Sequence, residues 1–391
     1  MKPFYQRLRR FSALLVGVVF LVSGLLKLID PVGTMLVLRA YFQFFGILFL
    51  SPAAKVLGIL LALFETALGI ALFTGVFRKA AARCTYILLG FFTVLTLVLW
   101  VFNPTMDCGC FGEAIHLTHA QSFWKNVILL ALSVFAFTPF HDFGKAKRYR
   151  KVAAIVAMLS VLYVLYYSNT HLPPVDFTEF DWGTELFASL DDEVAADNHY
   201  QAAYIYEKDG QEGIFDITDL PDSTWTFVGV DTVFRKTTAV TEKYPVLSFR
   251  DAEGEYRDRM AAEGKVVVIS VYEPAKAPWD KVQAQYHAVL EAGGVPLVLT
   301  SALPGDALLP AGLPVYFADY KTLITLNRSN GGGTYFDEGE LVNKWDVRHM
   351  PETLAADFAS DPVDLSTHYI VRRRLRTQGF CVYLAAVLLL L

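Results

Sequence analysis

Basic charge, cysteine and several catalytic motifs are scarce or missing in this chain. Lys and Arg number 34 against 39 Asp and Glu, a net charge of −5, so the composition gives no basis for nucleic-acid binding. The sequence lacks the phosphate-binding loop of P-loop hydrolases, the Gly-x-Ser-x-Gly turn of serine hydrolases and the His-Glu-x-x-His motif of zinc proteases. Only four cysteines occur in 391 residues. These absences argue against several common enzyme classes and leave the few cysteines as the features to explain.

Long apolar runs are what the chain has in excess, because 54% of its residues are hydrophobic. A helix needs about 20 apolar residues to cross a bilayer, and we expect five transmembrane helices. They cover residues 11–29, 56–77, 84–102, 123–140 and 152–167. A last run, 380–391, is about half of one span.

Lys and Arg are absent from residues 103–121 and gather near the N-terminus, at 78–83 and at 145–151. With five spans these three clusters share one side of the membrane, which the positive-inside rule makes cytoplasmic. We therefore expect a multi-pass protein of the inner (cytoplasmic) membrane with a cytoplasmic N-terminus. The 103–121 loop and a large soluble region would lie on the outer, periplasmic side.

The change in polarity after residue 170 predicts a mixed fold: an all-α transmembrane four-helix bundle plus a fifth span, followed by an α/β soluble domain. The tail combines a basic segment with an apolar one, so it either lies along membrane lipid or returns as a short span; we favour a short membrane-associated helix. The predicted segments are residues 1–145, 146–170, 171–243 (a connector with a β-hairpin), 244–360 and 361–391.

Two of the four cysteines, Cys108 and Cys110, flank a single glycine in the outer loop. An extracytoplasmic location permits disulfides, and a ring closed across one glycine would be strained and easily reduced, which suits thiol–disulfide exchange. The pair could instead be a loop-closing disulfide or two unpaired thiols. A further alternative is a zinc or copper(I) site formed with His116 and His119.

Lys27 is an ionisable residue near the outer end of the first apolar run, and Glu65 is one in the middle of the second. Such groups are costly in a membrane and are treated as functional by default. Pairing would neutralise both. They could form a proton relay, give polar support to a quinone beside the thiols, or only hold two helices together.

Three motifs, "SGLLKLIDP", "LFETALGIALFTG" and "NPTMDCGCFGE", resemble the DoxX/MauE group of small membrane proteins over residues 11–140. The resemblance implies a membrane component of disulfide formation in exported proteins, with Cys108 and Cys110 as the redox pair. The plan is also similar to the DsbB and VKOR thiol–quinone systems, so a membrane quinone is the acceptor that analogy suggests; no other cofactor is expected.

The soluble region predicts a hairpin over residues 204–217, a strand–helix–strand unit over 265–302 and a second hairpin over 333–345. The order over residues 244–355 resembles the thioredoxin-like fold, but "YEPAKAPW" stands where that family carries Cys-x-x-Cys. A domain without a thiol cannot exchange disulfides.

Two hypotheses follow. In the first, the chain is a thiol–disulfide oxidoreductase passing electrons between the Cys108–Cys110 pair, a membrane acceptor and an exported or periplasmic thiol protein. In the second, it is a non-enzymatic membrane scaffold whose redox-inactive thioredoxin-like domain binds a partner protein.

Overall fold

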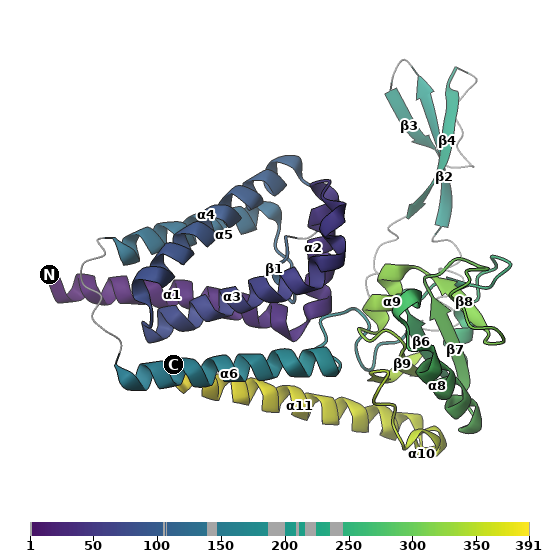
Figure 1. Cartoon of the computed structure of the whole chain (residues 1–391). Coiled ribbons are helices and arrows are strands. Elements are labelled where there is room, and N and C mark those ends of the chain that lie inside the picture. Colours follow the sequence, from purple (N-terminus) through teal and green to yellow (C-terminus); the bar gives the residue numbers. More distant parts are fainter. Residues whose placement is uncertain are drawn as a thin grey trace. The chain divides into compact units, whose positions relative to one another are not determined.

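The computed structural model describes residues 2–104, 106, 108–138, 147–186, 200–208, 211–215, 224–234 and 245–390. The chain divides into two compact units, each considered by itself below (Figure 1). The first, the helical unit, comprises Met1–Thr178 and Val371–Leu391. The second, the sheet unit, comprises Glu179–Ile370.

Five helices of the helical unit are long and apolar enough to cross a membrane: Phe4–Ile29, Leu48–Thr74, Arg78–Phe102, His119–Phe137 and Arg148–Thr170. Each of the five predicted apolar runs overlaps one of them. As structural elements these are α1 (Lys2–Ile29), α3 (Ala54–Thr74, preceded by the 3-10 turn η1, Leu48–Ala53), α4 (Arg78–Phe102), α5 (His119–Phe137) and α6 (Arg148–Thr170).

The ends of these helices follow local chemistry. At the end of α3, Gly75 takes a left-handed conformation and its N–H bonds to the carbonyl of Ala71. At the start of α5, Thr118 and Gln121 form a reciprocal capping box. Gly75 thus ends α3 and the capping box begins α5, and both boundaries lie within a few residues of the ends of the predicted apolar runs.

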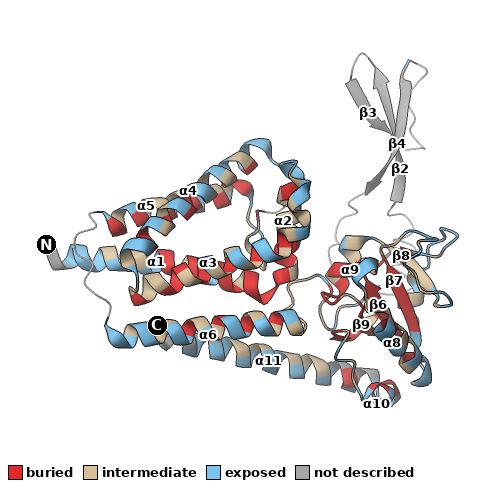
Figure 2. Ribbon diagram, viewed as in Figure 1, coloured by how far each residue is buried: buried red, intermediate tan, exposed pale blue. Residues whose placement is uncertain are grey.

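α1 and α3 approach closely because glycines line their contact. A Cβ on Gly24 would lie 2.2 Å from Oγ1 of Thr66, and one on Gly69 would lie 2.8 Å from the backbone N of Leu21. Small residues allow this backbone approach in membrane helices. α1 also contacts α5 and α6, and α4 packs on α5. Figure 2 shows buried residues concentrated along α1 and α3.

Two helices differ from the sequence prediction: one was not predicted, and the other is longer than predicted. α2 (Pro31–Phe44), capped by the Asp30 side chain on the N–H of Gly33, lies between the first two spans. With 14 residues, one of them Arg39, α2 is too short to span a bilayer, so the criterion of long apolar runs does not identify it. The tail was predicted as a short helix, but α11 (Pro362–Leu390) is a single helix of 29 residues that includes the basic segment.

The sheet unit is built on six strands in the order β10-β9-β6-β7-β8-β5. β6, β7 and β8 are parallel, while β9, β10 and β5 each pair antiparallel with a neighbour. The bounds are β5 (Phe249–Arg250), β6 (Lys265–Val271), β7 (Val295–Thr300), β8 (Val315–Ala318), β9 (Gly332–Asp337) and β10 (Glu340–Trp345). The helices are α8 (Trp279–Glu291), α9 (Tyr320–Leu326) and α10 (Leu354–Ala359), with 3-10 turns η3 (Asp258–Ala261) and η4 (Pro274–Lys276).

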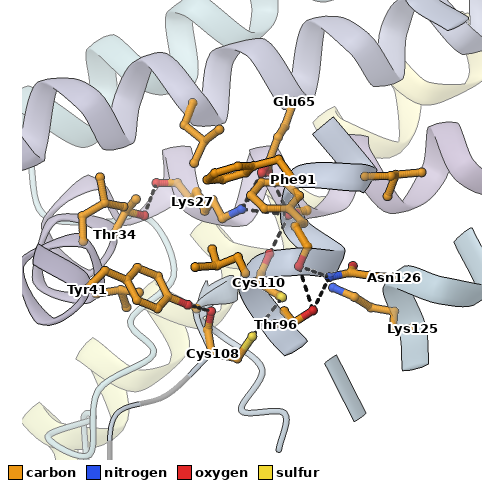
Figure 3. A pocket seen from close by; sticks show the side chains of 18 of the residues that line it. Lys27, Thr34, Tyr41, Glu65, Phe91, Thr96, Cys108, Cys110, Lys125 and Asn126 are labelled. Carbon is orange, nitrogen blue, oxygen red and sulfur yellow. Dashed lines mark hydrogen bonds and ion pairs between the residues drawn. The ribbon is translucent and has the colours of Figure 1, made fainter. Parts of the chain in front are cut away.

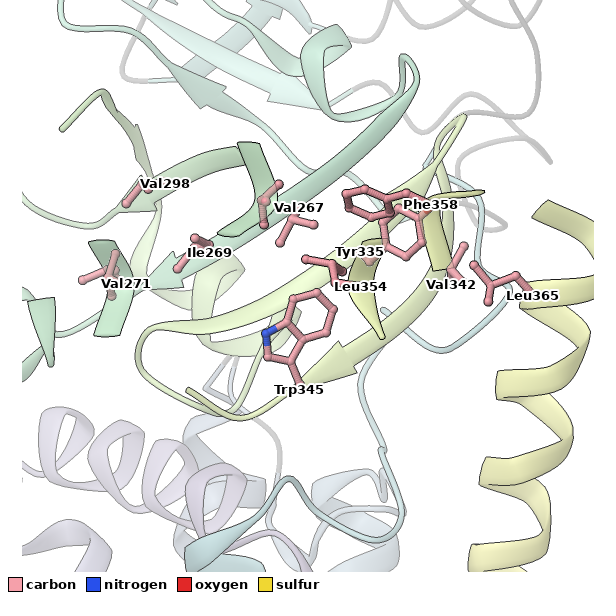
Figure 4. Packing of buried hydrophobic residues seen from close by; sticks show 12 residues of the cluster. Val267, Ile269, Val271, Val298, Tyr335, Val342, Trp345, Leu354, Phe358 and Leu365 are labelled. Atoms are coloured by element: carbon pink, nitrogen blue, oxygen red, sulfur yellow. The ribbon is translucent and has the colours of Figure 1, made fainter. Parts of the chain in front are cut away.

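The core of the sheet unit is apolar. Val267, Ile269 and Val271 of β6 alternate onto one face and pack with Tyr335 and Trp345 (Figure 4). The predicted strand–helix–strand unit is confirmed as β6, α8 and β7, and the hairpin predicted over 333–345 is confirmed as β9 and β10.

A separate three-stranded antiparallel sheet has the order β3-β2-β4. Its strands are β2 (Tyr200–Lys208), β3 (Gln211–Phe215) and β4 (Thr226–Phe234). The pairing of β2 with β3 confirms the hairpin predicted over residues 204–217; its turn, residues 209–210, lies outside the described residues.

Candidate functional site

Lys27 of α1 and Glu65 of α3 form a buried ion pair (Figure 3). The Lys27 Nζ lies 2.9 and 2.7 Å from the two carboxylate oxygens of Glu65, whose exposed fraction is 1%. The hydroxyl of Ser23 lies 2.9 Å from Glu65 Oε2 and 2.6 Å from the carbonyl oxygen of Cys110. The ion pair is therefore joined, through one serine, to the cysteine loop.

Cys108 and Cys110 lie in the loop after α4, with β1 (Cys110–Glu113) beginning at the second of them. Both are free thiols, and their sulfurs are 3.3 Å apart. The loop is held against α2, because the Tyr41 hydroxyl donates to the carbonyl of Cys108. Gly109 has φ +61° and a Cβ there would lie 2.2 Å from Val37 Cγ1, so both its backbone and its contact require glycine. The two thiols are thus held side by side.

The two cysteine side chains differ in acidity. The hydrogen bond to Cys110, with burial, raises the pKa of the Cys108 thiol. The same hydrogen bond lowers the pKa of Cys110 well below its usual range; the charges of Lys125 and Lys27 act in the same direction and burial opposes them. A lowered pKa favours thiolate, the reactive form. Of the two, Cys110 is therefore the side chain that loses its proton more readily.

A cavity of about 260 Å³ opens beside the sulfurs, between α1, α2, α3, α4 and α5. Its walls are mainly apolar and include Phe20, Phe45, Phe91 and Phe92. Its polar lining includes Cys108, Cys110, Lys27, Glu65, Thr96, Lys125 and Asn126, several of which are seen in Figure 3. The cavity can hold an apolar, ring-shaped molecule in reach of a thiolate.

Sequence reasoning missed Lys125 and Tyr41. Lys125 lies in α5, its Nζ 4.7 Å from the centroid of the Phe111 ring. The signal that singled out Lys27 and Glu65, an ionisable residue inside an apolar run, also applies to Lys125. Tyr41 lies on the unpredicted α2, so nothing in the sequence connected it with the cysteines.

The histidines of the metal alternative do not join the cysteines. His119 begins α5, and its Nε2 lies 3.0 Å from the carbonyl oxygen of Pro104. Within the described ranges, no group of three or more His, Cys, Asp or Glu residues is placed to hold a metal ion. Zinc or copper(I) at Cys108, Cys110, His116 and His119 therefore finds no support in the geometry.

The other two cysteines are also free: Cys84 is half-buried in α4, and Cys381 is exposed on α11. In the sheet unit, residues 272–279 follow β6 and contain η4. There the Tyr272 hydroxyl donates to the carbonyl of Arg328, and the N–H of Glu273 donates to Asn330. That loop is fixed by hydrogen bonds and carries no thiol.

Comparison with known families gives two matches. Residues 6–139 match the model of methylamine utilisation protein MauE, and residues 200–236 match a domain of unknown function (DUF8463). No curated protein and no solved structure matches the chain. The MauE match runs from α1 to just past the end of α5 and so includes every residue that lines the cavity. Residues 6–139 are thus similar to MauE, and with the five apolar helices this match indicates a multi-pass membrane protein.

Proposed function

We propose that the chain is a membrane thiol–disulfide oxidoreductase whose Cys108–Cys110 pair cycles between dithiol and disulfide. The observation that carries the proposal is the pair itself: two free sulfurs 3.3 Å apart beside an apolar cavity. The lowered pKa of Cys110 supports it, because thiolate is the form that reacts in exchange. The match of residues 6–139 to the methylamine utilisation protein MauE supports only the presence of a related helical unit, and the redox reaction is argued from the cysteines and the cavity.

The reaction has two halves. In the first, the two cysteines lose two electrons to an apolar acceptor of the quinone class in the cavity, the S–S bond forms, and the acceptor takes up two protons as it is reduced. In the second, a thiolate of an exported partner attacks that bond and forms a mixed disulfide, and a second partner thiol displaces the cysteine. The partner leaves with a disulfide and the chain regains its dithiol.

The topology proposed from the basic clusters places the cysteine loop and the sheet unit on the outer, periplasmic side of the inner membrane. We propose that residues 244–360 are a redox-inactive thioredoxin-like domain that binds the partner. The order of parallel β6 and β7 joined by α8, followed by the β9–β10 hairpin, supports this assignment. Residues 179–370 contain no cysteine, so their contribution would be binding.

A second candidate function is a non-enzymatic scaffold. The buried Lys27–Glu65 pair favours it, since an ion pair that bridges two helices can act purely as a structural contact. In that case the cysteines would only shape the loop, and replacing both by serine would leave partner binding and function intact.

Trapping of mixed disulfides tests the proposal. Cys108→Ser and Cys110→Ser variants, each in a chain with Cys84→Ser and Cys381→Ser, would be expressed in cells and treated with a membrane-permeant alkylating agent. At least one should accumulate a reducible adduct with an exported protein, and the chain that retains Cys108 and Cys110 should show both oxidised and reduced forms. If neither variant forms an adduct and the pair stays in one redox state, the scaffold reading holds instead.

A further inference from the structure

The side chain of Lys125 meets the cysteine pair from the opposite wall to Lys27. Both line the cavity, Lys125 from α5 and Lys27 from α1 (Figure 3). The Lys125 ammonium lies over the ring of Phe111, which directly follows Cys110, and its charge acts to lower the pKa of Cys110. It is half-buried, so its amine can recover a proton from water.

The two lysines are paired differently. Lys27 has the carboxylate of Glu65 within 2.7 Å, which offsets most of its charge. Within the part of the chain that the structure describes, Lys125 has no carboxylate at ion-pair distance; its ammonium lies against the Phe111 ring, and its side chain lines the cavity together with both cysteines. A cation without a carboxylate partner stabilises a nearby thiolate, and the effect grows as water is excluded.

The surroundings of Lys125 favour an acceptor with hydrogen-bonding oxygens. The next residue, Asn126, is buried with its Nδ2 3.2 Å from Thr96 Oγ1 and 3.2 Å from the carbonyl oxygen of Phe92. The wall of the same cavity also includes the aromatic rings of Phe91 and Phe92. A flat apolar ring would fit those walls, and a carbonyl oxygen at its edge would meet the Lys125 ammonium.

We propose that Lys125 is a catalytic residue of the thiol oxidation, stabilising the Cys110 thiolate and donating one proton to the reduced acceptor. This rests on the proposed function. Two electrons leave the sulfurs as the Cys108–Cys110 bond forms. The thiol of Cys108 gives up one proton and the Lys125 ammonium gives up the other, so that a quinone leaves as a quinol. The charges balance, because the thiolate and the ammonium are both neutralised.

Three variants of the full chain in lipid nanodiscs, all with Cys84→Ser and Cys381→Ser, separate the two roles. Lys125→Met removes the charge and the proton, while Lys125→Arg keeps the charge on a group that does not deprotonate. Lys151→Met, an exposed lysine of α6, is the control. Each protein is reduced, freed of reductant and mixed with a short-chain ubiquinone. Thiolate absorbance against pH and the single-turnover loss of quinone absorbance are then recorded.

We expect Lys125→Met to raise the pH midpoint of thiolate formation by about one pH unit or more and to slow oxidation by about a hundredfold or more. Lys125→Arg should keep the midpoint of the parent protein and remain slow, and Lys151→Met should change neither. Full oxidation rates in Lys125→Met, or rescue of the rate by arginine, would overturn the proton-donor role. An unmoved midpoint in Lys125→Met would overturn the thiolate role.

Failure of this inference can be told from failure of the proposed function. If quinone oxidises the parent protein and Lys125→Met equally fast, only the role of Lys125 is lost. If quinone does not oxidise the parent protein at all, both the role of Lys125 and the proposed reaction with a quinone are contradicted. Mixed-disulfide trapping, which needs no quinone, then decides whether partner exchange survives.

Discussion

The two units bury polar groups in opposite ways. In the helical unit three buried side chains, Lys27, Glu65 and Cys108, line one cavity. In the sheet unit the buried polar groups are held by the fold itself, as where Asn327 donates to the carbonyl of Gly333 and Trp345 donates to Gln285. Polar groups beside an open cavity can serve chemistry, whereas groups fully used by their own framework serve stability.

The largest effect that would test this contrast is removal of both thiols. Cys108→Ser/Cys110→Ser should abolish oxidation of any exported partner, because no other thiol lies beside the cavity among the described residues. The matched control, Cys84→Ser/Cys381→Ser, should retain it. The measurement is the redox state of partner cysteines in cells. If partner oxidation persists in Cys108→Ser/Cys110→Ser, the helical unit does not carry out the oxidation.

The ion pair gives the next largest effect. Glu65→Ala leaves the Lys27 ammonium buried without its carboxylate, and breaking a buried pair this way costs about 3–5 kcal/mol. Replacing both partners, as in Lys27→Met/Glu65→Leu, should be close to neutral. Thermal unfolding in detergent measures both.

The same pair of variants separates a structural from a functional role. If Lys27→Met/Glu65→Leu is stable and still oxidises thiols at the parent rate, the ion pair only joins α1 to α3. If it is stable and slow, the pair takes part in proton movement beside the cavity.

A smaller effect is expected at Gly109, which sits between the thiols. Gly109→Ala adds the cost of a left-handed residue, about 1–2 kcal/mol, and a contact with Val37. Gly46→Ala is a matched control, because Gly46 has φ +70° but open space around its Cβ position. Loss of stability and slower closure of the disulfide should both be greater in Gly109→Ala. Equal effects in the two variants would mean that contact with α2 does not position the thiols.

The membrane helices and part of the candidate site can be predicted from the sequence, whereas α2 and the position of Lys125 cannot, for physical reasons. Long apolar runs give the membrane helices, and an ionisable residue inside a run marks Lys27 and Glu65. α2 is short and carries Arg39, so it resembles a loop until its packing on α3 is seen. That Lys125 lines the same cavity as Cys110 depends on how α5 is rotated about its axis, which the spacing of residues along one helix does not fix.

The smallest effect tests whether the sheet unit stands apart from the chemistry. Ile269→Val removes one methylene from the core of β6 and should cost about 1 kcal/mol, at the usual scale for a buried deletion. Hydrogen exchange of β6, β7 and β9 should report that loss, because they form the centre of the sheet. The thiolate midpoint and the single-turnover oxidation of Cys108 and Cys110 should be unchanged, since a binding domain affects the rate only when the partner is present. A changed midpoint without partner would mean that the two units are energetically coupled, and that the sheet unit contributes to the reactive site as well as to recognition.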